Sequence, residues 1–425
     1  MRTMRKTEIE WIPNIPNTWE IKRNKLLFRE VNERCEKGSD HTLLSVSEHY
    51  GIAPKSEKIA DGEFETRAES LDGYKLCEVG DIVMNIMLAW KCSTGRSEYN
   101  GIVSPAYCVY RPIQDIDTRY YHYLFRTEIV ANLFKQHSTG IIDSRLRLYP
   151  DRFLALKMVV PPLPEQQAIS ALLDLQCARI DTIIENTKSS IEEYKKLKQA
   201  IITRAVTNGV RGNRPMKDSG IEWIGEIPEE WNSINPKALF VVRKDKAKSG
   251  ERQLTASQQY GVIYQEDYMR LTGAKVVTVE KDFDILKHVE AGDFVISMRS
   301  FQGGLEYSEN SGSISSAYVM LIPNSEKVYS KFYKWLFKSN LYINALQCTS
   351  NMVRDGQAMR YSNFSQVRLY EVPMEEQKEI ADYLEIKCNA IENLITKKEL
   401  FLLELESYKK SLIYEYVTGK KEVKA

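Results

Sequence analysis

The sequence contains few groups of residues whose types and spacing could carry out a reaction. It has no GxxxxGKS/T phosphate-binding loop, and no GxGxxG follows a predicted strand. It also lacks the Asn/Asp-Pro-Pro-aromatic stretch of amino-methyltransferases. Asp61, Glu63 and Glu65 form an acidic cluster, but their surroundings are typical of a solvated loop and not of a metal-dependent nuclease. We therefore expect a binding protein and no catalytic residues.

Metal binding is not predicted either. Seven cysteines occur without a CxxC pair and five histidines occur without HExxH, so zinc-ligand spacing is absent. An odd number of cysteines in a long chain is typical of a reducing compartment, and we expect a cytoplasmic location. No stretch reaches the roughly 18 apolar residues that a membrane span needs.

Two pairs of polar segments are better candidates for function. They are KCSTGRSEYNG (91–101) and HSTGIIDSRLRLYP (137–150) in the first half, and RSFQGGLEYSENSG (299–312) and CTSNMVRDGQAMRYS (348–362) in the second half. The segments occupy matching places but differ in sequence. This pattern indicates one task performed on two different ligands, with neutral drift of surface loops as the alternative.

The scaffold around these segments is duplicated. IEWIPNIPNTWEI (9–21) returns as IEWIGEIPEEWNS (221–233), so that Trp11 and Trp19 match Trp223 and Trp231. Predicted strands and helices follow in matching order: Val79–Met87 with Ala291–Met298, Ser104–Tyr110 with Ser315–Met320, and the helices Tyr120–Phe134 with Phe332–Leu346. We therefore predict two similar α+β domains.

Each half ends in a long amphipathic helix, over 162–209 and 373–420. Proline followed by acidic residues favours each helix start, and Gly209 and Gly419 are typical helix stops. At 1.5 Å per residue, a helix of this length would reach about 65 Å.

Apolar residues in both helices repeat at alternating steps of three and four, which is coiled-coil spacing. The predicted seam contains Leu173, Ile180, Ile184, Ile191, Tyr194, Ile201, Leu384, Ile391, Ile395, Leu402, Leu405 and Leu412. A parallel pairing would place Lys198 against Lys409. An antiparallel pairing places these lysines opposite Ile391 and Ile180, where their stems can cover the isoleucines. We therefore predict an intramolecular antiparallel coiled coil with pseudo-two-fold symmetry.

Bulk composition agrees with an ordinary globular protein. The chain has 425 residues, of which 43% are hydrophobic and 28% charged, with a net charge of +1. This length allows two or three domains. A balanced charge argues against a chain covered in basic tails, but a local basic groove remains compatible with nucleic-acid binding.

The repeated motifs resemble one known family. A half that opens with IEWIxxIPxxW and leads through PPLPEQQ (161–167) or VPMEEQ (372–377) into a heptad helix is similar to the specificity subunits of type I restriction-modification enzymes. The helices also carry Ile180-Asp181 and Ile391-Glu392 at matching places.

The resemblance implies a division of the chain and of its work. There would be two target recognition domains, residues 1–160 and 221–371. The helices over 161–209 and 372–420 would set the number of unread base pairs, the spacer, between the two parts of the DNA target. Residues 210–220 would be a linker and 421–425 a tail. Each domain would read one half of a split, asymmetric double-stranded DNA target. Two methyltransferase subunits using S-adenosylmethionine would methylate adenine, and motor-nuclease subunits using ATP and Mg would join them. No cofactor is expected in this chain.

On this basis the polar loops supply the candidate DNA contacts. Arginine, glutamine and asparagine fork onto base edges, whereas lysine more often contacts phosphates. The candidates for bases are Arg96, Arg145, Arg147, Arg299, Gln302, Arg354, Gln357 and Arg360; those for phosphates are Lys91, Lys244, Lys246 and Lys248.

Three alternatives remain open. The chain could have a hidden enzymatic activity, which S-adenosylmethionine binding by the isolated chain would reveal. It could be a coiled-coil scaffold that binds only proteins, in which case DNA binding with a steep salt dependence would be absent. It could also serve methylation only, or be a silent variant at a phase-variable locus.

Overall fold

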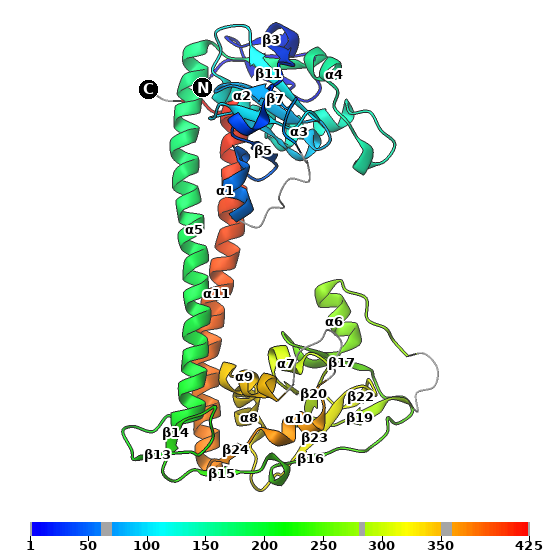
Figure 1. Cartoon of the computed structure of the whole chain (residues 1–425), viewed down its shortest axis with the longest axis vertical. Coiled ribbons are helices and arrows are strands. Elements are labelled where there is room, and N and C mark those ends of the chain that lie inside the picture. Colours follow the sequence, from blue (N-terminus) through cyan, green and yellow to red (C-terminus); the bar gives the residue numbers. More distant parts are fainter. Residues whose placement is uncertain (1, 61–69, 280–284, 350–358, 424–425) are drawn as a thin grey trace. The chain divides into compact units, whose positions relative to one another are not determined.

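The structure is a computed structural model that describes residues 2–60, 70–279, 285–349 and 359–423 (Figure 1). It divides into two compact units. The first comprises Met1–Thr187 and Leu400–Ala425, and the second comprises Lys188–Glu399. Two long helices, α5 (Leu163–Asn208) and α11 (Met374–Val417), each contribute one part to each unit.

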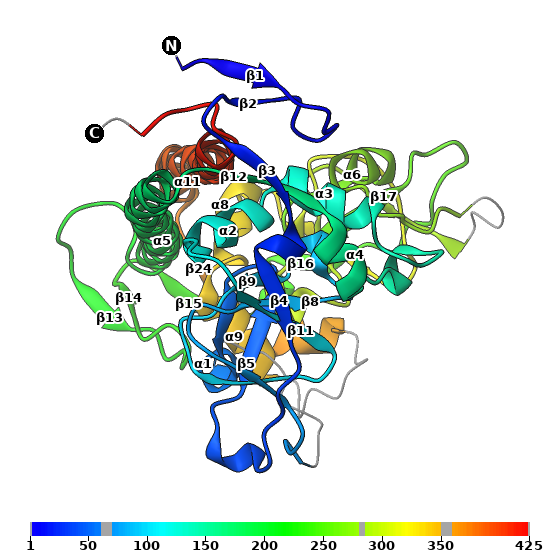
Figure 2. The same cartoon turned by 90° about the horizontal axis from the view of Figure 1, so that it is seen from above.

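The first unit is built around an antiparallel four-stranded sheet of order β4-β11-β8-β9. Two-stranded pairs flank this sheet, among them β1–β2 near the N-terminus (Figure 2) and β3–β12, which leads into α5. In chain order the elements are β1 (Met4–Lys6), β2 (Asn14–Pro16), β3 (Glu20–Arg23), β4 (Phe28–Val31), β5 (Leu44–Ser47), β6 (Gly51–Pro54), α1 (Lys55–Ala60), β7 (Lys75–Cys77), β8 (Ile82–Asn85), β9 (Thr94–Arg96), β10 (Gly101–Val103), β11 (Tyr107–Pro112), α2 (Thr118–Phe125), α3 (Glu128–Gln136), α4 (Pro150–Ala155) and β12 (Lys157–Val160).

The second unit repeats this pattern. Its four-stranded sheet has the order β16-β23-β20-β21, and the pair β15–β24 leads into α11. The elements are β13 (Met216–Asp218), β14 (Glu226–Pro228), β15 (Asn232–Ile234), β16 (Phe240–Val242), β17 (Leu254–Ser257), β18 (Gly261–Tyr264), α6 (Gln265–Thr272), β19 (Lys287–Val289), β20 (Phe294–Ile296), α7 (Ser300–Gly303), β21 (Glu306–Tyr307), β22 (Gly312–Ile314), β23 (Val319–Pro323), α8 (Ser330–Leu336), α9 (Asn340–Cys348), α10 (Tyr361–Gln366) and β24 (Leu369–Glu371). The predicted duplication of an α+β domain is confirmed.

Each predicted helix after the sheet is in fact two helices. The segment predicted as one helix over 120–134 breaks between α2 and α3, and that over 332–346 breaks between α8 and α9. At the breaks the Thr127 hydroxyl donates to the Leu124 carbonyl over 2.7 Å, and the Ser339 hydroxyl donates to the Leu336 carbonyl over 2.7 Å. Such a bond competes with the helical ladder, and Thr and Ser then serve as N-cap residues of the next helix.

The long helices pack against each other in antiparallel directions within each unit, as predicted (Figure 1). In the first unit Asp181 of α5 pairs with Lys409 of α11, and in the second unit Lys198 of α5 pairs with Glu392 of α11. All twelve seam residues are buried or half-buried. A glycine with positive φ follows the end of each helix: Gly209, at 73°, directly after α5, and Gly419, at 71°, two residues after α11.

A tryptophan clasp fixes the start of each long helix. The Trp19 indole donates to Glu165 Oε2 over 2.9 Å, and the Trp231 indole donates to Glu376 Oε2 over 3.0 Å. An arginine, Arg2 in the first unit and Arg214 in the second, forms an ion pair with the same carboxylate and lies over the indole ring. Each clasp therefore has an ion pair at its centre.

The glutamine after each clasp glutamate holds the domain to the helix. Gln166 Oε1 accepts from the backbone N–H of Asp117 over 3.0 Å, and Asp117 is the N-cap residue of α2. Gln377 Oε1 accepts from the N–H of Tyr329 over 2.7 Å, at the N-cap of α8. The Glu-Gln pair in each motif is therefore a joint between the α/β part of the unit and the long helix.

Candidate nucleic-acid interface

The two polar loops of the first unit lie at one edge of the domain. The backbone N–H of Leu148 donates to the Ile86 carbonyl over 3.0 Å, which joins the second loop to the end of β8, five residues before the first loop begins. Lys135 of α3 lies between them: its Nζ is 2.9 Å from Asp143 Oδ2 and 4.8 Å from the centroid of the Trp90 ring. Lys91, next to Trp90, is exposed.

The second loop of this unit has a closed base. Thr139 and Arg147 exchange two backbone hydrogen bonds, of 2.8 and 3.0 Å. Arg147 is half-buried, and its guanidinium donates to the Leu146 carbonyl over 2.8 Å. Arg145 is exposed and has no hydrogen-bond or ion-pair partner of its side chain among the residues that the structure describes. Of the two predicted arginines, Arg145 is therefore the one that is free to contact a ligand.

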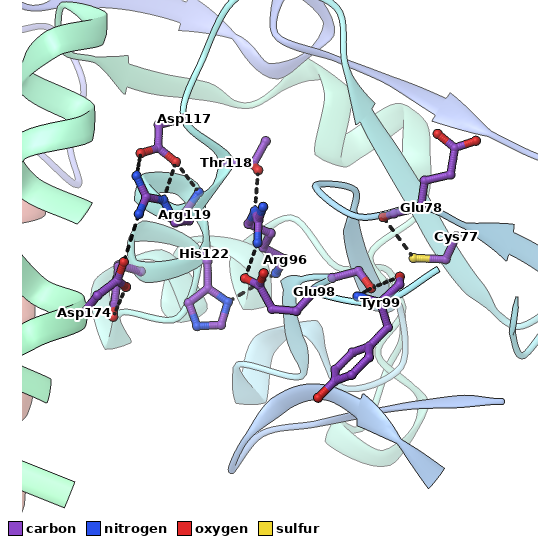
Figure 3. A network of polar contacts seen from close by, with 12 residues as sticks. Cys77, Glu78, Arg96, Glu98, Tyr99, Asp117, Thr118, Arg119, His122 and Asp174 are labelled. Carbon is purple, nitrogen blue, oxygen red and sulfur yellow. Dashed lines mark hydrogen bonds and ion pairs between the residues drawn. The ribbon is translucent and has the colours of Figure 1, made fainter. Parts of the chain in front are cut away.

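Arg96 is engaged in hydrogen bonds and an ion pair with neighbouring residues of the first unit (Figure 3). Its Nε donates to Thr118 Oγ1 over 3.0 Å, its guanidinium pairs with Glu98, and its backbone N–H donates to His122 Nδ1 over 3.2 Å. Only 18% of the Arg96 side chain is exposed, whereas Glu98 is 62% exposed. Contact between Arg96 and DNA would therefore require Glu98 to be replaced.

His122 is kept neutral in this network. Burial lowers the pKa of His122 to about 3, with further contributions from the positive charges of Arg126 and Arg96. The neutral ring accepts the Arg96 N–H at Nδ1, so its proton lies on Nε2. The ring also lies against the backbone at Gly51 and Gly95, where a Cβ would come within 3.2 Å of it.

A second network joins α2 to the long helix α5 (Figure 3). Arg119 pairs with Asp117 at 2.7 Å and with Asp174 of α5 at 3.1 Å. The Tyr123 hydroxyl donates to the other Asp174 oxygen over 2.8 Å. Burial and this hydrogen bond raise the pKa of Tyr123. These contacts fix the position of the domain edge against α5.

In the second unit Gln347 of α9, directly before the second polar segment, donates to the Phe301 carbonyl of α7 in the first segment over 2.7 Å. The Asn363 amide donates to the Thr349 carbonyl over 3.2 Å, which brings the two described ends of the second segment together. Arg299 and Gln302 of the first loop and Arg360 of the second are exposed. Arg354 and Gln357 lie outside the described residues.

Three of the four predicted phosphate-binding lysines lie between β16 and β17. Lys244, Lys246 and Lys248 are all exposed. Arg243, directly before them, forms a bidentate pair with Asp293, at 2.6 and 3.0 Å. In the first unit Arg111 binds Asp81 in the same way, at 2.9 Å for both bonds. These arginines tie the sheet together and are not free for DNA.

Sequence reasoning missed two groups at these edges. Lys135 and Trp90 join the loops of the first unit, and the exposed Ile141 and Ile142 stand in the second loop. The signal for the isoleucines was present, since two consecutive large apolar residues are unusual in a polar loop. The pairing of Arg96 with Glu98 could also be anticipated, because the two residues are oppositely charged and only two positions apart.

Metal ligands do not gather in the part of the chain that the structure describes. Among those residues, no three His, Cys, Asp or Glu side chains lie together in a way that could hold a metal ion. The acidic cluster of Asp61, Glu63 and Glu65 lies outside the described residues. Within the described ranges no helix combines the length and apolarity that crossing a bilayer requires.

Comparisons with known proteins agree on one family. Residues 228–400 match the family described as "Type I restriction modification DNA specificity domain". Two specificity subunits from Methanocaldococcus jannaschii are similar: the putative type I restriction enzyme MjaX subunit is 24% identical, covering 99% of this chain and 97% of its own, and the MjaVIII subunit is 25% identical, covering 96% and 94%.

Solved structures share the fold. A chain from a study of complex assembly and conformational transition of the type I R-M system has a TM-score of 0.69 at 13% identity, covering 96% of this chain and 99% of that one. The HsdS subunit from Thermoanaerobacter tengcongensis has a TM-score of 0.53 at 14% identity, with coverages of 96% and 98%. Residues 228–400 thus form a type I restriction modification DNA specificity domain, and the chain over nearly its whole length is similar to the specificity subunits of type I restriction-modification enzymes, which are the non-catalytic subunits of those complexes.

Proposed function

We propose that this subunit reads a split, asymmetric DNA target, with one half-site bound by the polar loops of each unit. The observation that carries the proposal is the duplicated scaffold, whose matching polar segments differ in sequence between the two copies. A shared scaffold gives both units the same way of approaching DNA. Different loops give each unit a different base sequence to read.

Exposure divides the candidate residues into two groups. Arg145, Arg299, Gln302 and Arg360 are exposed and can present forked donors or an amide to base edges. Arg354 and Gln357 remain candidates on the sequence alone. Arg96 would reach DNA by exchanging Glu98 for a guanine edge or a phosphate, and Arg147 would shape the loop that carries Arg145.

Lysines would supply the sequence-independent part of the binding. Lys91 at the edge of the first unit and Lys244, Lys246 and Lys248 in the second are exposed ammonium groups on long stems. Such groups neutralise phosphates and release counterions without distinguishing base pairs. They would fix the orientation of each unit on the duplex.

The paired helices would set the number of base pairs between the half-sites. A seven-residue insertion into both helices, after Thr187 and after Glu399, preserves the Asp181–Lys409 and Lys198–Glu392 pairs. It lengthens each helix by about 10 Å, which corresponds to about 3 base pairs. The number of base pairs between the half-sites should increase accordingly while both half-sites stay the same. An unchanged number would contradict the proposal that the helices set this distance.

Partners would complete the enzyme. The chain would bind two methyltransferase subunits, which use S-adenosylmethionine to methylate adenine, and restriction subunits that use ATP and Mg. Duplex adenine must leave the stack to be methylated, so a methyltransferase would stand beside each recognition unit. The similarly folded chain from a study of type I R-M complex assembly supports a role within a complex.

Methylome sequencing tests the proposal directly. Cells that produce this chain together with its methyltransferase partner should carry methyladenine in one motif with two unlike halves and a fixed gap. Cells with the partner alone are the control and should lack that motif. A continuous motif, or methylation independent of this chain, would contradict the proposal.

A further inference from the structure

The tip of the second polar loop in the first unit is apolar. Ile141 is 99% exposed, the highest fraction among the exposed large hydrophobic residues that the structure describes, and the adjacent Ile142 is 53% exposed. The other exposed residues between Thr139 and Arg145 are Gly140 and polar side chains. Single exposed apolar residues are ordinary on protein surfaces, so the surroundings of these two decide their meaning.

The loop holds this tip in a defined shape. Two backbone hydrogen bonds between Thr139 and Arg147 close its base. The N–H of Arg145 donates to the Ile142 carbonyl over 2.8 Å, which makes a tight turn directly after the tip. The Lys135–Asp143 ion pair of 2.9 Å ties the same turn to α3. The isoleucines are therefore presented outward by an ordered loop.

Two exposed cations belong to the loop of the tip and to the neighbouring loop. Arg145 is exposed and its side chain is without a partner in the described part of the chain. Lys91, on the neighbouring loop, is also exposed, and its Nζ lies 5.2 Å from the centroid of the Trp90 ring. Asp143 is the nearby acid, and Lys135 neutralises it. An apolar tip accompanied by exposed positive charge fits a polyanion with an apolar interior better than it fits an apolar protein surface. Stacked base pairs between phosphate chains have this chemistry.

We propose that Ile141, supported by Ile142, inserts between two adjacent base pairs of the first half-site and kinks the duplex there. Isoleucine is one of the side chains that proteins use as wedges, and such insertion partly unstacks a base step and bends DNA by about 20–90°. Arg145 and Lys91 hold the phosphates on either side of the step. The inference rests on the proposed function, because it places the tip within a half-site.

The wedge gives the first unit a second source of specificity. Pyrimidine–purine steps unstack more readily than others, so the half-site should contain such a step where the tip inserts. Opening the stack beside the target adenine also lowers the work needed to extrude that base for the partner methyltransferase. The first unit would thus prepare its half-site as well as read it.

The test uses the complex of the full chain with its methyltransferase partner, bound to a duplex that carries the motif found by methylome sequencing. 2-Aminopurine replaces one base at a time across the half-site, and end-to-end energy transfer reports the bend. Wild type should raise 2-aminopurine fluorescence several-fold at one step distinct from the methylated adenine. The variant Ile141→Ser/Ile142→Ser should lose this rise and the bend, and its affinity for the specific duplex should fall roughly tenfold.

A matched control separates this effect from a general surface change. Ile113 is 48% exposed in the same unit and lies outside both polar loops, so Ile113→Ser should behave as wild type. All three isoleucines are exposed, and their variants should unfold at the same urea concentration as wild type.

Three results separate the claims. An unchanged fluorescence profile and bend in the double variant overturn the wedge while the split motif stands. Weaker binding of the double variant to the methyltransferase partner in the absence of DNA overturns it in favour of a protein contact at the tip. Absence of any split motif with wild type defeats the proposed function itself, whatever the tip does.

Discussion

Lys198 Nζ lies 2.6 Å from Glu392 Oε2, and the matching Lys409 Nζ lies 2.6 Å from Asp181 Oδ1. Each seam lysine thus binds the acid that follows the seam isoleucine of the other helix. The step from Asp181 to Lys198 along α5 equals the step back from Lys409 to Glu392 along α11, so both pairs specify one antiparallel register.

Charge reversal tests this register. Glu392→Lys brings two ammonium groups together and should lower the free energy of unfolding by about 1 kcal/mol, since both partners are partly exposed. The double variant Lys198→Glu/Glu392→Lys restores opposite charges and should recover most of the loss. Urea unfolding followed by tryptophan fluorescence measures both. A double variant no more stable than Glu392→Lys would show that the pair does not contribute to the register.

The two tryptophan clasps should differ in strength. Glu376 is 1% exposed and its partner Arg214 is 11% exposed at the side chain, whereas Glu165 is 21% exposed. Glu376→Gln keeps an acceptor for the Trp231 indole but leaves Arg214 largely buried without its close carboxylate. It should cost about 3 kcal/mol. Glu165→Gln should cost roughly 1 kcal/mol. Thermal unfolding of both variants compares them, and equal losses would contradict the role assigned to burial.

Lowering the pH should destabilise the first unit, because buried His122 resists protonation in the folded chain. Its pKa is lowered to about 3 in the folded chain against an ordinary value of 6.5. Below pH 6.5 His122 binds a proton in the unfolded chain but not in the folded chain. The contribution of His122 to the free energy of unfolding is therefore fully present above pH 6.5 and is lost as the pH falls towards 3. For a half-buried ring the loss is on the order of 2 kcal/mol.

The variant His122→Gln isolates this effect. Its stability will differ from that of wild type at pH 8, because the backbone N–H of Arg96 loses its acceptor or gains a different one. The informative quantity is therefore the slope of stability against pH between 6.5 and 4.5, measured by urea unfolding. The slope should be shallower in His122→Gln, and identical slopes would show that His122 is protonated in the folded chain.

The phosphate-binding assignment predicts a salt effect without a change of motif. Replacing Lys244, Lys246 and Lys248 by alanine should lower the slope of log affinity against log salt by about one for each phosphate that is no longer neutralised. The methylated motif should stay the same, because phosphate contacts do not read bases. Alanine at the exposed Lys331, on α8, serves as the control. A changed motif in the triple variant would instead place these lysines on base edges.

The sequence predicted the duplicated domains and the helix direction because both leave local signals. Trp11 and Trp19 recur at the same spacing, and a lysine inside an apolar seam is costly in one direction and tolerable in the other. The helix breaks at Thr127 and Ser339 were missed because apolar periodicity continues across them. A hydroxyl that binds a carbonyl three residues back alters the backbone without altering that periodicity.

The polar contacts of the site were harder to foresee. The Trp19–Glu165 hydrogen bond joins residues far apart in the chain, and neither segment contains a local pattern that predicts the contact. Arg96 has the right side chain for reading guanine, but its exposure depends on Glu98 and Thr118, which fold against it. Residue type alone therefore did not show which of the candidate side chains are free.

Exchange of one recognition unit tests the central claim most directly. Residues 20–155 are replaced with the corresponding domain of another specificity subunit of known target, and the methylome of cells carrying the chimera and its methyltransferase partner is sequenced. One half-site should change to that of the donor while the other half-site remains. A change in both half-sites, or in neither, would contradict the claim that each unit reads its own half of the target.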